Sequence, residues 1–462
     1  MANIKLSDKL AIGRDTTDLE DFNVSTSSFL LSVILVAAIT WLLTSIMMRS
    51  VLNANHAMIA ILSAKELLAT NNMIFLAIIV FFASIRAYLY QLPWFKDAFG
   101  DGASKALAHF HSTYSEDKQP DTIINEAYSK GTFSFAIKRV VVTIMTLGAG
   151  GSGGIEGPSI PVGQHVGTGV AKILEVRDIM WLRVLEMCGI SAAITTLLHA
   201  PLTGAVFALE LVFGCKFVYR LLICSFISSL IAFVLSNHLL DAESLFTISR
   251  HAIHYTPFEY LMVVVVTVFA SIPSGIGLVL IFSLIRKGYA YIPPMMRAPF
   301  GAFMCAVTAI SMYHFYDINP HHILGVGEET ILELFEHAEH DVVHYSWQIL
   351  VAIVLLKMVL TGFTIVSGGS AGLLVPAIFV GALSSNALFQ LLTVYDLMPI
   401  TEGLQTLFMV TGIASSLICV MDLPIATVLF VGEIFDFSFI APCIIAVAIS
   451  RIISQNIKRY LK

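Results

Sequence analysis

The chain is poor in charged residues. Asp, Glu, Lys and Arg make up 13% of its 462 residues, whereas soluble domains carry about 25%. Hydrophobic residues make up 57%, so the composition excludes an ordinary soluble domain and predicts a polytopic membrane protein. Several apolar runs are long enough to cross the hydrocarbon layer as helices, namely 29–48, 73–90, 260–285 and 347–366. These runs do not alternate polar and apolar residues as barrel strands do, so we expect an all-α fold.

Cysteine is also scarce. The six cysteines lack the spacing of metal ligands and fall mostly in apolar runs. We therefore expect buried free thiols, with no metal site and no cofactor. The formal net charge of −6 argues against nucleic-acid binding.

The N-terminal residues 1–27 have no apolar signal-peptide core, so they predict a cytoplasmic N-terminal segment. Basic residues cluster in this segment, in the linker 286–297 and near the C-terminus. By the positive-inside rule, both termini are expected in the cytoplasm. The tail 456–462 is short, and we expect no regulatory domain after it.

The most informative stretch is Gly-Ile-Glu-Gly-Pro at Gly154 to Pro158, which lies between two apolar runs. A charged side chain at the centre of a membrane helix costs ~2.5–3.5 kcal/mol on insertion scales. Irregular backbone at that depth is tolerated only where it is buried in protein or lines a water-filled cavity. Glu156 inside a glycine-rich break therefore predicts an ion pathway.

The sequence contains an internal repeat. Ser152–Pro158 resembles Ser370–Pro376, with Gly154 and Gly372 separated by 372 − 154 = 218 residues. Pro201–Glu210 resembles Pro424–Glu433, at an offset of 223 residues (424 − 201), and each predicts a helix that starts at the proline and ends in Glu. We therefore predict two transmembrane repeats, 28–235 and 258–455, joined by a connecting segment 236–257.

Each repeat begins its motif with a broken helix, marked by Gly154 and Pro158 in the first and by Gly372 and Pro376 in the second. The helix starts that follow would aim free backbone N–H groups at one point, which suits an anion. Interrupted helices at matching positions of two repeats are typical of a binding site near the membrane midplane. The alternative, in which the glycines only allow close helix packing, stays open.

These motifs together resemble the CLC family of chloride channels and chloride/proton exchangers. Gly154–Pro158 is similar to the family's G-[KR]-E-G-P, with Ile155 in the basic position. Gly372–Pro376 is similar to its G-x-F-x-P, with Leu374 in the aromatic position. The resemblance covers about 28–455. It implies two inverted-topology repeats of tilted, broken helices, forming a homodimer in the lipid of the plasma membrane, the inner membrane of a bacterium.

The resemblance also implies functional residues. Backbone amides of Ile155, Glu156, Gly157, Leu373 and Leu374 would bind chloride. Glu156 would be the gate, because its ionised carboxylate occupies the outer anion site until it is protonated or displaced. In proton-coupled members the same residue belongs to the proton pathway.

Asp101 and Leu211 also depart from the family pattern, and Tyr460 is a doubtful match to it. The family's G-S-G-I-P motif has its only candidate at Gly100–Ser104, where Asp101 stands in place of the serine. An ionised Asp101 would repel chloride at short range, so it is protonated, points away or lies in a rearranged loop, unless it is a loop aspartate off the pathway. Leu211 occupies the place of the second glutamate of many exchangers and cannot take a proton. Tyr460 is the candidate for the family's central tyrosine, or else an interfacial anchor.

The sequence also contains weaker matches to the motifs of other functional classes. Gly368–Gly372 matches the G-x-S-x-G turn of serine hydrolases, and Gly148–Gly153 matches a dinucleotide fingerprint, but neither has the flanking strands that these sites need. His337 and His340 are three residues apart and could share a metal, although a solvated amphipathic helix explains them as well. A scaffold or sensor with the same fold but without transport is a further alternative.

We therefore expect a transporter and no enzyme. Its substrate would be chloride or a similar monovalent anion, carried by a channel-like or weakly proton-coupled pathway that Glu156 gates. A fully coupled chloride/proton exchanger is the main alternative.

Overall fold

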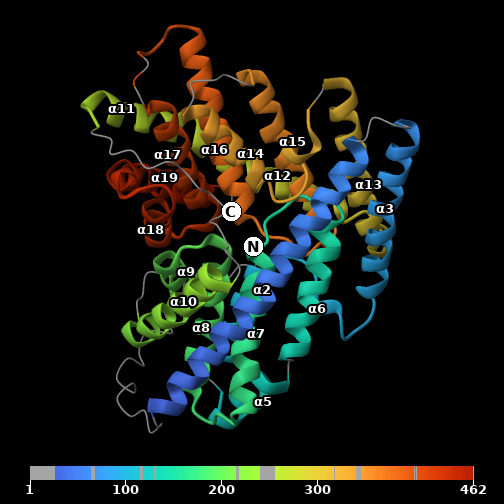
Figure 1. The fold of residues 1–462 in the computed structure, drawn as a ribbon, viewed down its shortest axis with the longest axis vertical. Coiled ribbons are helices and arrows are strands. Elements are labelled where there is room, and N and C mark those ends of the chain that lie inside the picture. The colour runs from blue at the N-terminus through green and yellow to red at the C-terminus, as the bar shows by residue number, and fades with distance from the viewer. Residues whose placement is uncertain are drawn as a thin grey trace. The chain divides into compact units, whose positions relative to one another are not determined.

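The computed structural model describes residues 26–63, 68–114, 118–129, 132–214, 218–239, 255–316, 318–339, 345–399, 401 and 403–460. Its regular structure is helical throughout these ranges, as predicted (Figure 1). Ten helices of the described part are long and apolar enough to cross a membrane. Most of the expected segment 1–27 and most of the connecting segment 236–257 lie outside the described residues.

The chain forms two compact units that interleave along the sequence. Unit 1 contains residues up to Arg49 together with Asp101–Val141 and Glu156–Leu245. Unit 2 contains Ser50–Gly100, Val142–Ile155 and the residues from Phe246 onward.

Unit 1 is built around the helix pair α7 (Glu156–Ile173) and α8 (Ile179–Leu198). The other helices with residues in this unit are α2 (Thr26–Ser63), whose second part belongs to unit 2, α4 (Gly102–Thr113), α5 (Pro120–Ser129), α6 (Phe133–Thr143), α9 (Pro201–Phe213) and α10 (Tyr219–Leu239). Glycine allows the central pair to approach closely. A Cβ added at Gly163 would lie 2.1 Å from the Gly189 carbonyl oxygen, so neither position has room for a side chain.

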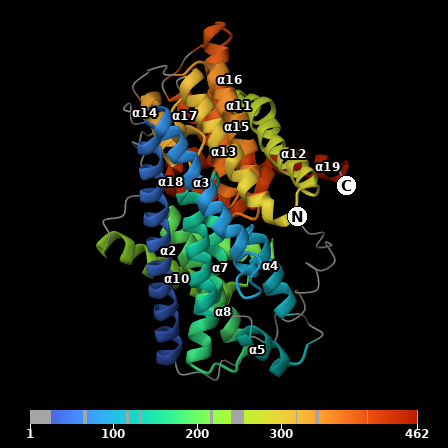
Figure 2. The same cartoon turned by 90° about the vertical axis from the view of Figure 1, so that its right-hand side faces the viewer.

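Unit 2 holds the remaining long helices, with α16 (Leu374–Val394) packed against α17 (Leu404–Met421). Figure 2 shows α3 (Leu68–Leu89) beside α13 (Pro294–Tyr316). The others are α11 (Pro257–Val266), α12 (Ile272–Tyr289), α14 (Glu328–Glu339), α15 (Trp347–Val366), α18 (Pro424–Ile434) and α19 (Ile440–Tyr460). The predicted run 260–285 crosses a short π-helical segment, Thr267–Ser271, between α11 and α12.

The internal repeat is present in the helix packing. In unit 2, a Cβ at Gly381 would lie 2.5 Å from the Gly412 carbonyl oxygen, the same close crossing that Gly163 and Gly189 make in unit 1. The offsets are 381 − 163 = 218 and 412 − 189 = 223, which are the offsets of the sequence motifs. These four glycines lie inside their helices and allow close packing without breaking them.

The ends of the paired helices repeat as well. His199 closes α8 in the left-handed conformation with φ 58°, and Asp422 closes α17 with φ 57°. Pro201 and Pro424 then open α9 and α18, as predicted. Proline is well suited to a first helical position because the N–H that it lacks would have no helical partner there.

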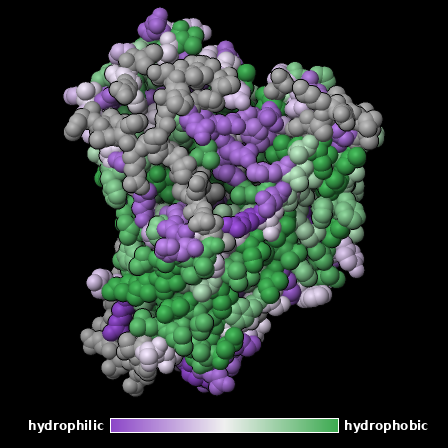
Figure 3. Space-filling model, viewed as in Figure 1, coloured by the Kyte–Doolittle hydropathy of each residue, from purple (hydrophilic) through white to green (hydrophobic). Residues whose placement is uncertain are grey.

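The outer surfaces of several helices are apolar. Figure 3 shows hydrophobic side chains over the visible face of α2, where Leu31, Ile34 and Leu42 are each about half exposed. Contiguous exposed apolar surface of this kind is unusual for a soluble protein but suits contact with lipid chains. The protein is a multi-pass integral membrane protein.

Candidate anion site

Two glycine-rich segments pair with each other inside unit 2. The Gly154 N–H donates to the Gly372 carbonyl oxygen at 3.0 Å, and the Gly372 N–H donates back to the Gly154 oxygen at 2.8 Å. Gly153, before the bridge, has φ +155° and would bring a Cβ within 2.7 Å of the Ala371 Cβ. Glycine is therefore required by the close approach of the two segments.

Both segments lead directly into a helix. Helix α7 begins at Glu156 and α16 begins at Leu374, each two residues beyond its bridging glycine. Pro158 and Pro376 occupy the third position of their helices, where a missing N–H breaks no helical hydrogen bond. The backbone N–H groups of Ile155, Leu373 and Leu374 thus belong to loop-to-helix junctions.

Glu156 is buried at the first residue of α7, with 1% of its side chain exposed. Its backbone carbonyl accepts a hydrogen bond from Ser159 Oγ at 2.7 Å, which stabilises the first turn. The positive end of the helix dipole favours a negative charge at this position. The same end can therefore hold either the carboxylate or another anion.

Asp101 caps α4 in unit 1. Its carboxylate accepts from the backbone N–H of Ala103 at 3.3 Å, from the N–H of Ser104 at 3.4 Å and from Ser104 Oγ at 2.5 Å. A carboxylate at this position satisfies amides that have no helical partner. The amides at the start of α4 are thus already occupied by the protein's own side chain.

The start of α4 lies against the start of α7. A Cβ added at Gly102 would lie 2.0 Å from the Gly157 carbonyl oxygen and 2.6 Å from Arg139 Nη2. The buried guanidinium of Arg139 interacts electrostatically with Asp101. The structure therefore brings Asp101 near the first turn of α7, with a positive charge beside it.

Glu186 is an acid that sequence reasoning missed. It is 1% exposed on α8 and accepts hydrogen bonds from Tyr114 Oη at 3.0 Å, from Gln164 Nε2 at 3.1 Å and from Thr168 Oγ1 at 3.0 Å. Its only available sequence signal was a lone acid inside an apolar helix, which marks a candidate functional group.

Glu186 is connected to the end of α9 by aromatic contacts. The ring of Tyr114 lies 4.7 Å from that of Phe110, which lies 5.8 Å from that of Phe213. Phe213 is two residues after Leu211. Unit 1 thus holds a buried carboxylate on α8 that aromatic side chains connect to the end of α9, the helix of Leu211.

Lys357 is a second buried charged residue that sequence reasoning missed. It is fully buried on α15, where its Nζ donates to the carbonyl oxygens of Leu324 at 3.2 Å and Gly325 at 3.0 Å. Gly325 in turn pairs with Ser152, because the Gly153 N–H donates to its oxygen and its own N–H donates to Gly151. The lysine thus holds the backbone of Leu324 and Gly325, and Gly325 pairs with the segment that leads along the chain to Glu156.

Two predicted groups fall outside the description. Tyr460 is the last residue of α19, and its side chain lies outside the described part. The same holds for His340 and for the side chain of His337.

Other histidines of that region are described. His321 and His322 lie near Glu333, and their ligand atoms all fall within 4.8 Å of one another. Both ring nitrogens of His322 already have partners, Thr330 Oγ1 at 3.0 Å and Tyr345 Oη at 2.8 Å. Burial, followed by the neighbouring His321, lowers the pKa of His322 to about 4, so its ring is neutral at pH 7.

Comparison with known proteins decides the family. A family model described as voltage gated chloride channel matches residues 88–455, most of the chain. The chain belongs to this family. The resemblance to CLC proteins that the motifs indicated is thereby confirmed.

CLC relatives and solved structures extend over much of the chain. It is 23% identical over 388 residues to an uncharacterized protein of Methanocaldococcus jannaschii, covering 82% of this chain and 84% of that one. It is 25% identical over 309 residues to a chloride/fluoride channel protein of Pseudomonas syringae pv. tomato, covering 64% and 61%. The fold is similar to that of a slow cyanobacterial Cl⁻/H⁺ antiporter, with TM-score 0.75, 15% identity and coverage of 93% and 94%. It is also similar to a CLC-type fluoride/proton antiporter, with TM-score 0.68, 19% identity and coverage of 93% and 96%.

Proposed function

We propose that this CLC protein carries chloride or a similar monovalent anion across the plasma membrane and that Glu156 gates the pathway. The observation that carries the proposal is the burial of Glu156 at the first residue of α7, two residues beyond the bridge between Gly154 and Gly372. Burying an ionisable side chain at this depth costs free energy, so its presence points to a functional role. No enzymatic activity is part of the proposal.

The mechanism follows from competition for backbone amides. Amides of Ile155, Glu156 and Gly157 in one junction, and of Leu373 and Leu374 in the other, would bind the anion. The ionised Glu156 carboxylate is itself an anion and competes for the same electrostatic environment. Protonation or displacement of the carboxylate then frees the position for chloride.

Asp101 and Tyr460 have smaller roles in this mechanism. The capping geometry supports a role for Asp101 in shaping the start of α4 rather than in holding chloride with its carboxylate. Asp101 then modulates the local charge together with Arg139. Tyr460 stays a prediction from the family resemblance alone.

A liposome flux assay tests the gate. The substitution Glu156→Gln removes the charge but keeps the size, so we expect chloride efflux that no longer depends on pH between pH 4 and pH 7. Glu210→Gln, a buried acid of unit 1 on α9, is the matched control and should keep the pH dependence of the wild type. Equal pH dependence in wild type and Glu156→Gln would contradict the proposal.

Proton-coupled exchange is the second candidate. The buried Glu186 favours it, because this carboxylate could bind a proton in the unit where Leu211 cannot. Reversal potentials in a bilayer with a pH gradient separate the candidates. A reversal at the chloride Nernst potential means a channel, whereas a shift with the pH gradient means coupling. Failure to pass any anion in both assays would favour the scaffold alternative.

The family also suggests the assembly. We propose a homodimer with one pathway per subunit and with both termini in the cytoplasm. Cross-linking in native membranes tests the dimer, and accessibility of a cysteine introduced near Lys462 tests the orientation.

A further inference from the structure

Unit 2 contains a buried guanidinium that forms no ion pair with a carboxylate of the described residues. Arg86, in the last turn of α3, has only 6% of its side chain exposed. Its Nη1 donates to Thr146 Oγ1 at 3.0 Å, while its buried Nε has no hydrogen-bond partner. None of the ion pairs found among the described residues includes Arg86. A buried cation of this kind is costly unless an anion compensates it.

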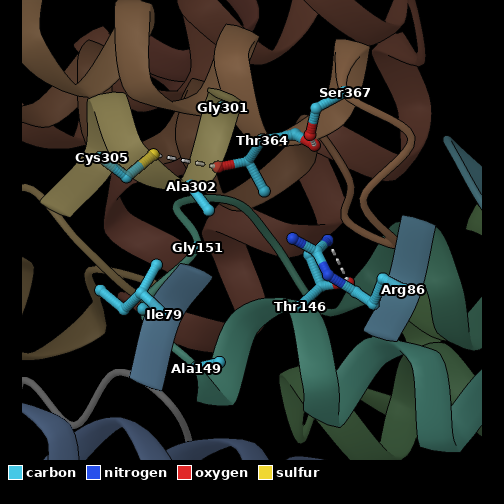
Figure 4. Close-up of a pocket in the computed structure, with 11 residues that line it drawn as sticks. Ile79, Arg86, Thr146, Ala149, Gly151, Gly301, Ala302, Cys305, Thr364 and Ser367 are labelled. Carbon is cyan, nitrogen blue, oxygen red and sulfur yellow. Dashed lines mark hydrogen bonds between the residues drawn. The ribbon is translucent and has the colours of Figure 1, made fainter. Parts of the chain in front are cut away.

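Arg86 lines two cavities in unit 2. The smaller one has room for about one water molecule and lies beside Thr146 and Gly151, with the guanidinium directed toward it (Figure 4). The larger one, of about 60 Å³, is lined by Arg86 and also by Arg297, Ser367 and Gly368. No acidic residue is among the lining residues of either cavity.

Arg297 is the second positively charged residue that lines the larger cavity. Arg297, on α13, donates from Nε to the Ile292 carbonyl oxygen at 2.9 Å, which fixes the guanidinium without neutralising it. Arg86 on α3 and Arg297 on α13 therefore both line the larger cavity. Charge balance favours an anion there.

We propose that the larger cavity, between α3, α13 and the turn after α15, is an accessory binding site for a small monovalent anion such as chloride or bromide. Arg86 supplies the buried positive charge and Arg297 a second, more accessible one. The unpartnered Nε of Arg86 is a donor that such an anion would satisfy. This site is distinct from the gate proposed at Glu156.

The site is connected to the loop that precedes α16. Thr146 Oγ1, which accepts from Arg86, also accepts from the Ser370 N–H at 3.1 Å. Ser370 lies two residues before Gly372, which forms the bridge with Gly154. An anion that holds the guanidinium in place thus also stabilises the position of Thr146 under this loop.

Bromide diffraction locates the anion directly. Crystals of the full-length wild-type protein grown in bromide should give an anomalous peak within hydrogen-bond distance of the Arg86 guanidinium. A peak elsewhere with none at Arg86 would overturn the proposal. This measurement uses the native protein and therefore does not depend on whether a variant folds.

Calorimetric titration of the purified protein with chloride gives the stoichiometry. We expect Arg86→Gln to bind one anion fewer per chain than the wild type. Arg86→Lys should keep the site with about tenfold weaker affinity, because lysine keeps the charge but lacks the planar set of donors. Arg286→Gln, at an exposed arginine near the end of α12, is the matched control and should bind as the wild type does. Wild-type stoichiometry in a folded Arg86→Gln protein would contradict the proposal.

Two further outcomes are distinguishable. If native mass spectrometry finds a phospholipid retained by the wild type but not by Arg86→Gln, and bromide is absent from Arg86, the occupant is a lipid phosphate and the small-anion proposal fails. Glu156→Gln should keep the bromide peak at Arg86 whether or not it loses gating. Failure of the gate and failure of the accessory site are therefore separate results.

Discussion

Gly154 and Gly372 hold each other through two reciprocal backbone hydrogen bonds of 3.0 and 2.8 Å, although 218 residues separate them (372 − 154). Each glycine stands two residues before a helix start, Glu156 for α7 and Leu374 for α16. The pairing therefore ties together the two loop-to-helix junctions that contain Ile155 and Leu373.

Crowding at the neighbouring Gly153 should weaken this pairing. In Gly153→Ala the new Cβ would lie 2.7 Å from the Ala371 Cβ, so one segment has to move. We expect a loss of stability of about 1–3 kcal/mol, the range for strained backbone and overpacking, together with reduced anion flux. Thermal unfolding and liposome efflux measure the two effects.

Gly214→Ala is the matched control for that change. Gly214, after the end of α9, also has a positive φ, +65°, but a Cβ there meets nothing within 4 Å. It should cost stability through backbone strain alone and leave flux nearly unchanged. Equal flux in the two variants would show that the contact with Ala371 is unimportant for transport.

Replacing Glu186 by Gln should reduce any proton coupling. The change removes the titratable group and places an amide N–H₂ opposite donors from Tyr114, Gln164 and Thr168. We expect a reversal potential closer to the chloride Nernst potential, with anion flux retained. A planar bilayer with a pH gradient provides the measurement.

The converse variant tests whether the position of the acid matters. Leu211→Glu, combined with Glu186→Gln, restores a carboxylate near the end of α9 and should restore part of the shift with pH. If the reversal potential of Glu186→Gln shifts with pH as that of the wild type does, the Glu186 carboxylate has only a structural role, in which its hydrogen bonds join α7 and α8.

Changes at Asp101 should separate its capping role from its charge. Asp101→Ser keeps a capping oxygen, so we expect stability close to that of the wild type, and removal of the negative charge should strengthen apparent chloride binding. Asp101→Ala loses the cap and should cost about 1 kcal/mol. Denaturation and chloride titration of both variants check this, and a stable Asp101→Ala protein would argue against the cap.

Acid should destabilise the protein through His322. Burial lowers the pKa of this side chain from 6.5 to about 4, with His321 as the next cause. Between these values the unfolded chain binds a proton that the folded protein excludes. The contribution to stability is therefore fully present above pH 6.5 and is lost as the pH falls toward 4.

The measurement for His322 is the unfolding midpoint as a function of pH. His322→Gln should flatten the fall between pH 6.5 and pH 4, whereas His56→Gln, at an exposed histidine, should not. A wild-type fall that His322→Gln leaves unchanged would assign the acid sensitivity to other groups.

Much of the fold was predictable because its signals are local. Apolar runs predicted the helices that α2, α3 and α15 confirm, and Pro201 and Pro424 predicted the starts of α9 and α18. The motif offsets predicted two related halves of the chain, and the close helix crossings at Gly163 and Gly381 have the same offsets. The roles of the site residues, by contrast, depend on bound ions and stay predictions.

The sequence by itself determined that this is a helical membrane protein with two related sets of broken helices and an acid at one of the breaks. Hydrophobic length, glycine and proline act over a few neighbouring residues, so they can be read along the chain. Only the tertiary structure decided that Asp101 caps its own helix, that Glu186 has three hydrogen-bond donors and that Arg86 is buried with no ion-pair partner among the described residues. These facts depend on partners far apart in sequence, which burial and packing select and which local pattern does not specify.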